Sequence, residues 1–415
     1  MKRLCVKLTI LVTISLVFHT SRCFGYSVLT HEAIIDANWN TALIPALRQK
    51  FPAATDEELK NAHAFAYGGC VMPDLGYYPF GSKLFTNLVH YVRGGDFIEN
   101  LFKEASNINE YAFALGALCH YYADKYGHSV GVNRSVPLIY PEMKRKFGDT
   151  VTYADDKISH LRTEFSFDVL QTARGNYASQ AYHDFIGFQV SKELIEKAFL
   201  RTYGLEVNEL FGNFDRAVGS FRWSVKELIP SATRAAWKLK RKEISELNPS
   251  VARRSYVYSV RRRKYFEEFG RERDKATFGE SVLAFLIRIA PKWGPLKILK
   301  FRIPDEAAQK MFLESFDETV AHYRHQVNSM GNAYFELSNV DWDTGKKTMQ
   351  GEYSLADKTY SDWLIKLKEK NFATITSSMK KNILAFYKNH SSDSTIDTEQ
   401  WKQTAAALDE LKIEK

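Results

Sequence analysis

The 415-residue sequence has few cysteines, no long apolar run and no sustained alternation of apolar and polar residues. Four cysteines are too few for a disulfide-rich scaffold. The apolar run Leu8–Phe18 is too short to cross a bilayer as a permanent anchor. Since half-buried strands alternate apolar and polar residues, the lack of alternation argues against a large sheet. The length still allows a sizeable core in one or two domains.

The first 25 residues have the pattern of a secretory signal peptide. Three basic residues precede the apolar run, and Gly25 provides a small residue at the expected cut. An arginine directly before Cys23 argues against a lipid-modified cysteine. We therefore expect a secreted or periplasmic protein whose mature chain begins at Tyr26. Cleavage would leave Cys70 and Cys119, which allow one disulfide at most.

The basic charge of the chain is concentrated in one segment. The formal net charge is +8, but residues 1–25 carry four cations and no acid, so the mature chain would carry +4. Residues 234–275 contain fourteen Lys or Arg and six acids, with interleaved aromatic residues. This pattern fits a surface for nucleic acid, a patch for peripheral contact with an anionic membrane, or a solvated helix face. Residues 281–303 fit either a membrane surface or a buried helix.

Most periodic segments are typical of helices. Helix starts are indicated at Thr30, at a capping box formed by Thr55 and Glu58, and at Asn107 or Asn109. The helix beginning near Asn107 is expected to continue through His128, with Gly127 as a weak point. Residues 153–175 and 178–203 predict two more helices. We therefore predict an all-α fold.

Histidines in the first 160 residues have neighbours that suit a metal site. His120, Asp124 and His128 are each four residues apart, so they share one stripe of a helix. His160 and Glu164 repeat this spacing. The candidate side-chain ligands, enough for a multinuclear zinc centre, are His31, Asp74, His90, His120, Asp124, His128, His160 and Glu164. His63, His183, His322, His325 and His390 lack such neighbours and are expected to be structural.

These motifs resemble a known family. In chain order, YSVLTH, VMPD, LVHY, CHYYADKYGH and SHLRTE resemble the zinc-dependent phospholipase C superfamily, whose relatives include zinc-dependent single-strand nucleases. HYYADKYGHSVG and PDLGYYP are also similar to the amino-terminal domain of glycosylphosphatidylinositol-specific phospholipase D. The resemblance extends over residues 26–165 and implies an all-α fold with three zinc ions.

The resemblance also implies three sets of ligands. The first zinc would be held by Asp74, His90, His120 and Asp124. The second would be held by the amine and carbonyl of Tyr26, by His31 and by Asp124, which bridges the pair. The third would be held by His128, His160 and Glu164. Tyr26 replaces the Trp of the secreted phospholipases, and the short interval from Asp124 to His128 agrees with the phospholipase D-type domain.

We therefore predict a hydrolase, a zinc-dependent phosphodiesterase of phospholipase C type. Zinc lowers the pKa of bound water towards about 7, so metal-activated water could attack a phospholipid or a related phosphodiester. Asp74, Asp124 and Glu164 are the predicted catalytic residues, with Asp74 placed to act as both ligand and proton acceptor. Residues 26–205 would form the phospholipase C-like domain, and residues 206–415 a helical, basic extension. The alternatives are a single-strand nuclease acting on nucleic acid and a non-catalytic, metal-stabilised binding module.

Overall fold

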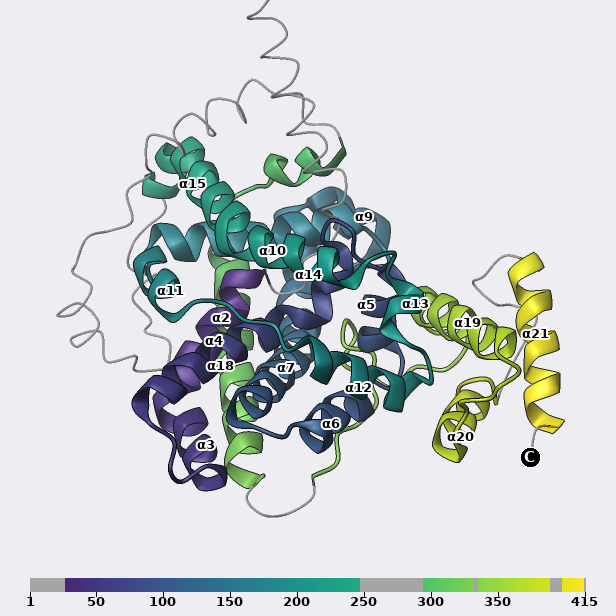
Figure 1. Ribbon diagram of the computed structural model, residues 1–415. Helices are drawn as coiled ribbons and strands as arrows, with labels where there is room; N and C mark the ends of the chain where they lie inside the picture. The colour runs from purple at the N-terminus through teal and green to yellow at the C-terminus, as the bar shows by residue number, and fades with distance from the viewer. Residues whose placement is uncertain (1–26, 247–293, 331–334, 389–397, 414–415) are drawn as a thin grey trace, which may run out of the picture.

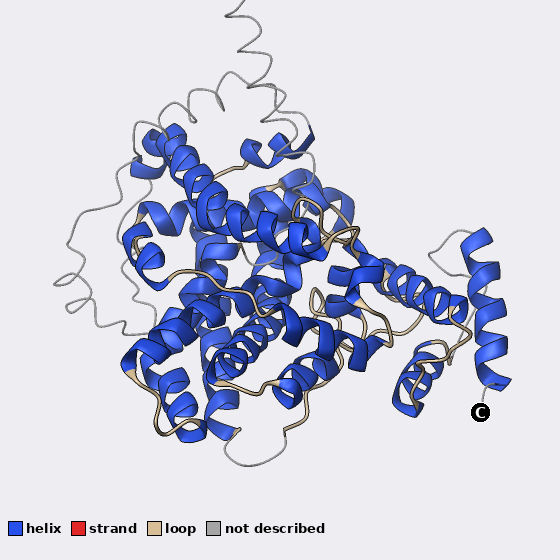
Figure 2. Cartoon of the chain, in the orientation of Figure 1, coloured by secondary structure: helices blue, strands red, loops and turns tan. Residues whose placement is uncertain are grey.

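The computed structural model describes residues 27–246, 294–330, 335–388 and 398–413. These residues form helices joined by loops, and they include no strand (Figures 1 and 2). The prediction of an all-α fold is therefore confirmed. None of the described helices is long and apolar enough to cross a membrane. The predicted signal peptide, Tyr26 and most of the basic segment lie outside the described residues.

The helices follow one another with short connections. Those of the amino-terminal half are α2 (Val28–Asn38), η1 (Trp39–Leu43), α3 (Ile44–Lys50), α4 (Asp56–Val71), η2 (Met72–Tyr77), α5 (Lys83–Tyr91), α6 (Gly94–Glu104), α7 (Ile108–Tyr126), η3 (Gly127–Val132), α8 (Asn133–Ile139), α9 (Pro141–Phe147), α10 (Lys157–Ala173), α11 (Gln180–Ile186) and α12 (Lys192–Tyr203). The later ones are α13 (Val207–Leu210), α14 (Phe214–Trp223), η4 (Ser224–Leu228), α15 (Ile229–Glu246), η6 (Gly294–Lys300), α18 (Glu306–Ser329), α19 (Ser354–Glu369), α20 (Ser377–Phe386) and α21 (Thr398–Ile413).

Two of the predicted helix starts are confirmed, and one is wrong. Thr55 and Glu58 form the capping box of α4, and the Asn107 side chain caps α7. Helix α2 begins at Val28 rather than after Thr30. The hydroxyl of Thr30 instead donates to the buried carboxylate of Asp168 over 2.8 Å. The Thr30 side chain therefore makes a tertiary hydrogen bond and does not cap the helix.

Two predicted helices end earlier than expected. The segment 178–203 is split into α11 and α12 at Gly187, whose φ of +86° is unsuited to a helix. Beyond this break, the N–H of Gln189 donates to the carbonyl of Ala64 over 2.9 Å. Helix α7 ends at Tyr126, and His128 lies in the π-helical turn η3. The weak point expected at Gly127 is confirmed.

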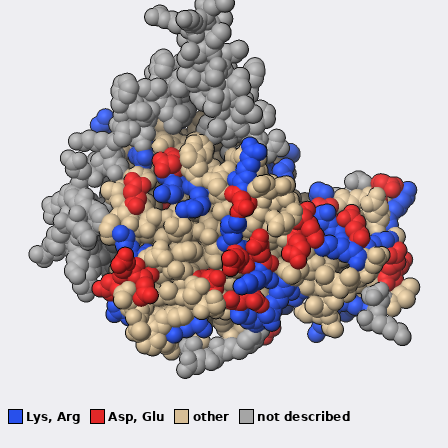
Figure 3. Space-filling model, viewed as in Figure 1, with Lys and Arg blue, Asp and Glu red and all other residues tan. Residues whose placement is uncertain are grey.

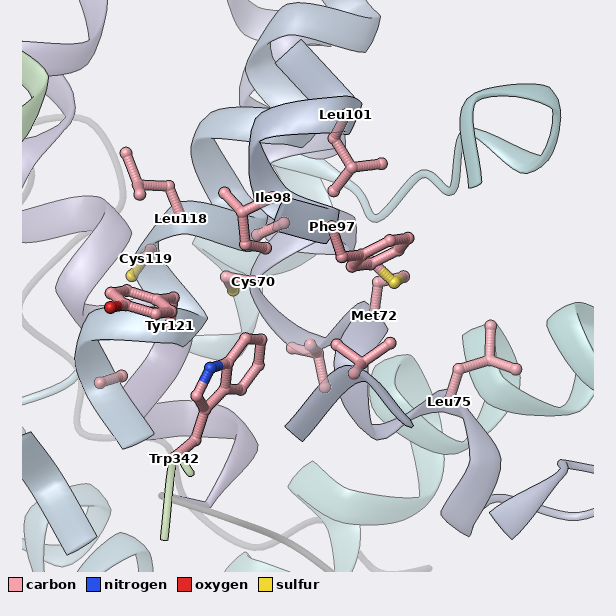
Figure 4. Close-up of a cluster of buried hydrophobic side chains, with 14 of the residues drawn as sticks. Cys70, Met72, Leu75, Phe97, Ile98, Leu101, Leu118, Cys119, Tyr121 and Trp342 are labelled. Atoms are coloured by element: carbon pink, nitrogen blue, oxygen red, sulfur yellow. The ribbon is translucent and has the colours of Figure 1, made fainter. Parts of the chain in front are cut away.

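Helices α4 and α7 form the centre of the fold, where their backbones touch. A Cβ atom on Gly116 of α7 would lie 2.1 Å from the carbonyl oxygen of Ala66 in α4. A Cβ atom on Gly69 of α4 would lie 2.0 Å from the carbonyl oxygen of Phe113 in α7. Glycine is therefore required at this contact, because any side chain would push the helices apart. Nearby, Cys70 and Cys119 are buried free thiols (Figure 4).

The carboxy-terminal half packs against this centre. Helix α18 contacts α7, α8 and η3, and the Tyr323 hydroxyl donates to the carbonyl of Leu115 over 2.8 Å. Buried apolar residues from Val28 to Leu411 form one continuous cluster. Helices α19, α20 and α21 project on one side, where charges of both signs are interspersed (Figures 1 and 3). The domain boundary at residue 205 stays a prediction.

Candidate metal centre

Five buried ligand candidates come from four neighbouring elements. His120 and Asp124 lie one turn apart on α7, His90 lies near the end of α5, Asp74 lies in η2, and His31 lies on α2. Each of these five residues is buried, with at most 5% of its surface exposed. The turn η2 begins directly after α4, with Pro73 near its start. It therefore brings Asp74 back beside the helix that carries His120.

Backbone carbonyls orient the imidazole rings. The Nδ1–H of His120 donates to the Cys70 carbonyl over 2.8 Å, and the Nδ1–H of His90 donates to the Thr86 carbonyl over 2.8 Å. These bonds leave Nε2 of each ring as the metal-binding nitrogen. The Nε2 atoms of His90 and His120 face each other at 3.3 Å. Hydrogen bonds to the second ring nitrogen commonly fix histidine ligands in this way.

The first group consists of Asp74, His90, His120 and Asp124. Oδ2 of Asp124 lies 3.2 Å from His90 Nε2 and 3.1 Å from His120 Nε2, and Oδ1 of Asp74 lies 3.5 Å from His90 Nε2. Zinc bonds of about 2.0–2.1 Å in a tetrahedral site place the ligand atoms about 3.3 Å apart. Within the described part of the chain, Oδ1 of Asp74 and both oxygens of Asp124 are buried without a hydrogen bond. These residues therefore fit zinc.

The second group lies on the other side of Asp124. Oδ1 of Asp124 lies 3.3 Å from His31 Nε2, and the rings of His31 and His120 stack at 4.3 Å. His31, His120 and Asp124 thus form a group with metal-binding geometry. The predicted ligand Tyr26 lies just outside the described residues and stays a prediction. Asp124 turns one oxygen towards each group, as expected for a bridging carboxylate.

The third group, here called the third site, consists of His128, His160 and Glu164. His160 Nδ1 lies 2.7 Å from Glu164 Oε1, and His128 Nε2 lies 3.7 Å from the same oxygen. Both oxygens of Glu164 are buried and accept no hydrogen bond from any residue that the structure describes. His128 Nε2 also lies 3.7 Å from Oδ1 of Asp124. The third site is therefore continuous with the other two groups.

Sequence reasoning missed Asp343, which lies against the third site. Its Oδ1 is 3.0 Å from His128 Nδ1 and 3.6 Å from His160 Nε2. Among the described residues, Asp343 rather than Glu164 joins these two histidines in a group with metal-binding geometry. Beside it, the backbone N–H of Trp342 donates to the backbone carbonyl of His90 over 3.1 Å, and the rings of these two residues lie 4.9 Å apart. Trp342 lies among the central apolar side chains (Figure 4). Asp343 has no regular sequence spacing from the candidate ligands, so the sequence provided no signal for it.

Burial and mutual charge shift the pKa values in opposing directions. Burial, reinforced by the charge of Asp124, raises the pKa of Glu164 well above its usual range. Burial lowers the pKa of His160 to about 3. Burial also lowers the pKa of His90, but the nearby carboxylates of Asp124 and Asp74 outweigh it and raise the pKa to about 10. Divalent cations would favour ionised carboxylates and neutral imidazoles together.

Two histidines outside the centre are paired with acids. His63 Nε2 lies 3.1 Å from Asp36 Oδ1, and His183 Nδ1 lies 2.8 Å from Glu32 Oε2. The ring of His63 also stacks on Trp39. Among the described residues, neither histidine joins a group with metal-binding geometry. The structural roles expected for both histidines stay predictions.

An all-α fold with buried histidines and carboxylates in adjoining groups defines a candidate multinuclear metalloprotein. Residues 30–213 match the family model described as zinc dependent phospholipase C. The matched residues make up somewhat less than half of the chain, and they support the resemblance to the zinc-dependent phospholipase C superfamily that the sequence motifs indicate. No curated protein and no solved structure matched the chain. The predicted side-chain ligands lie within the matched residues, whereas Asp343 lies outside them.

Proposed function

We propose that this protein is a zinc-dependent phosphodiester hydrolase of phospholipase C type, acting on a phospholipid or a related phosphodiester. The observation that carries the proposal is the position of Asp124 between two groups of histidines. Its Oδ1 lies 3.3 Å from His31 Nε2, and its Oδ2 lies 3.1 Å from His120 Nε2. A carboxylate so placed can hold two metal ions close together, which suits phosphodiester hydrolysis.

The residues of the centre have separate tasks in this proposal. Zinc, when bound, supplies an acidified water and stabilises charge that grows on phosphoryl oxygens. Asp124 fixes the spacing of the first two groups, and Asp74 accepts the proton released by the attacking water. The third site offers three protein ligands, so it leaves a position for a substrate oxygen. Glu164 is essential there, because it is the carboxylate of that set.

The first experiment compares substrates. Full-length mature protein is loaded with zinc and assayed on phosphatidylcholine vesicles, phosphatidylinositol vesicles and single-stranded DNA, with and without a chelator. We expect chelator-sensitive hydrolysis of phospholipid. Cleavage of DNA alone would replace the substrate class with that of a nuclease. Hydrolysis of none of the three would contradict the enzyme proposal and favour a metal-stabilised binding module.

A matched pair of variants tests the role of Glu164. Glu164→Ala should abolish turnover with limited loss of fold, because it removes a ligand of the third site. Glu193→Ala is the control, since Glu193 is exposed in the first turn of α12, an element that supplies none of the proposed ligands. Equal activity of the two variants would contradict the assignment of Glu164.

We further propose that the protein is secreted and that signal cleavage creates the amino terminus at Tyr26. The free amine and carbonyl of Tyr26 would then complete the second group beside His31. Amino-terminal sequencing of the secreted protein tests this, because a start at any other residue removes the ligand. Peripheral membrane contact by residues 234–275 also stays a prediction, which binding to anionic and neutral vesicles would test.

A further inference from the structure

We propose that Asp343 is a positioning residue of the third site, contributed by the carboxy-terminal half of the chain. It accepts the Nδ1–H of His128 and thereby turns Nε2 of that ring towards Glu164. The inference rests on the proposed zinc site of His128, His160 and Glu164. It makes the site depend on a residue outside the region that matches the family.

The two nitrogens of each imidazole in the third site have different surroundings. His128 Nδ1 is hydrogen-bonded to Asp343 Oδ1 over 3.0 Å, and His160 Nε2 is hydrogen-bonded to Asn133 Oδ1 over 2.7 Å. The opposite atoms, His128 Nε2 and His160 Nδ1, are buried and make no hydrogen bond with any described residue. Both of these atoms lie on the side of Glu164. Each ring is thus anchored on one side and open on the side of the proposed metal.

The carboxylates of Asp343 and Glu164 differ in the number of hydrogen bonds that they accept. Oδ1 of Asp343 accepts from His128, and Oδ2 accepts from the N–H of Tyr153 over 3.1 Å and from the hydroxyl of Tyr353. Glu164, by contrast, accepts no hydrogen bond on either oxygen from the described part of the protein. A buried carboxylate without donors is costly unless a cation compensates it. Glu164 therefore suits a metal ligand, whereas Asp343 is satisfied as an acceptor.

The loop that carries Asp343 is fixed to the site at several points. The Asn133 side chain accepts from His160 through Oδ1 and donates through Nδ2 to the Asp343 carbonyl over 2.8 Å. One amide thus sets the relative position of His160 and Asp343. The backbone N–H of the neighbouring Trp342 donates to the His90 carbonyl. Loss of such a supporting hydrogen bond typically lowers metal affinity about 10–100-fold.

The test measures metal binding by the full-length mature protein, separately from turnover. Zinc affinity is determined by competition with a chelator, and cobalt replaces zinc to report coordination by its absorption spectrum. Asp343→Ala should weaken binding at the third site about 10–100-fold and leave the other two sites unchanged. Its cobalt spectrum at saturation should keep the wild-type form, because the set of ligands is the same. Asp343→Asn should restore part of the affinity, because the amide oxygen can still accept from His128.

Two further variants, Glu164→Gln and Tyr353→Phe, distinguish failure of the proposed zinc site from failure of the positioning role. Glu164→Gln should lose one zinc altogether, and retention of all three would show that the underlying site is wrong. If Glu164→Gln loses a zinc while Asp343→Ala binds as wild type does, only the positioning role is overturned. A changed cobalt spectrum in Asp343→Ala would make Asp343 a ligand and also overturn it. Should Asp343→Ala not fold, Tyr353→Phe decides: a selective loss of affinity at the third site supports the proposal, and wild-type affinity refutes it.

Discussion

Substitution of Gly116 by alanine should disturb both the core and the metal centre. The new Cβ would lie 2.1 Å from the Ala66 carbonyl oxygen and 2.8 Å from the Cys70 nitrogen. Both are backbone atoms of α4, so no side-chain rotation relieves the clash. Since ordinary contact begins at 3.4 Å, α4 and α7 must separate locally by roughly 1 Å.

The energetic result is a competition between two effects. Forcing extra atoms into a packed core costs about 1–3 kcal/mol. Replacement of glycine by alanine within a helix stabilises the folded protein by about 0.5–1 kcal/mol. Because the clash is with backbone, we take the upper part of the first range and expect a net loss of about 2 kcal/mol. His120 follows Gly116 by one turn and donates to the Cys70 carbonyl over 2.8 Å, so the same separation should weaken zinc binding.

Denaturant unfolding of the zinc-free protein measures the stability term, and chelator competition measures zinc affinity. Gly219→Ala is the matched control, because Gly219 lies within α14 and its added Cβ meets no described atom within 4 Å. That control should gain up to about 1 kcal/mol. If Gly116→Ala behaves like Gly219→Ala, the proposed close packing is wrong. If stability falls and zinc affinity does not, the coupling to His120 is wrong.

Three other predictions concern charge and metal. Removal of zinc should lower the free energy of unfolding by about 4 kcal/mol for each site that was held at a thousandfold excess over its Kd, and unchanged thermal unfolding would contradict this. Asp124→Asn should lower the zinc content by two ions per chain, whereas loss of a single ion would contradict the bridge. Burial lowers the pKa of His183, but the charge of Glu32 outweighs burial and raises it to about 9. The stability from His183 is therefore fully present below about pH 6.5 and lost as pH rises through 9, by at most about 3 kcal/mol. His183→Gln should flatten the pH dependence of denaturant unfolding over that range relative to wild type, and an unchanged slope would refute the assignment.

Local helix geometry pairs four of the candidate ligands that were named from the sequence. His120 and Asp124 lie one turn apart and approach to 3.1 Å, and His160 and Glu164 do so at 2.7 Å. Such contacts follow from the helix itself, whatever surrounds it. Asp343 contacts His128 across 215 positions of sequence. Only the packing of the carboxy-terminal half creates that contact, and no local spacing encodes it.

The helix boundaries also divide into those set by local sequence and those set by tertiary contacts. The capping box at Thr55 is a local signal between residues three positions apart, and it was readable from the sequence. The hydroxyl of Thr30 looked equally suitable as a cap, but it serves Asp168, which lies 138 positions away. The sequence pattern across 178–203 was typical of a helix, yet Gly187 allows a turn there. Local rules thus hold until a buried partner competes for the same polar group.

The dependence of the site on distant residues leads to a prediction for truncated chains. A chain ending at residue 213 keeps the residues matched by the family but loses α18 and Asp343. Phe312 of α18 stacks on Phe167 at 4.3 Å, and the Tyr323 hydroxyl donates to the carbonyl of Leu115. Loss of α18 would therefore expose the core residues that it covers to water. We expect this fragment to aggregate even with zinc present.

A chain ending at residue 388 is the control for this truncation. It loses α21, which packs on α19, but keeps α18 and the loop of Asp343. We expect it to stay folded and to bind zinc with the affinity of the full chain, measured by chelator competition. If the chain ending at residue 213 also folded and filled its third site normally, Asp343 would have no positioning role. The carboxy-terminal half would then be an accessory to the metal centre rather than a part of it.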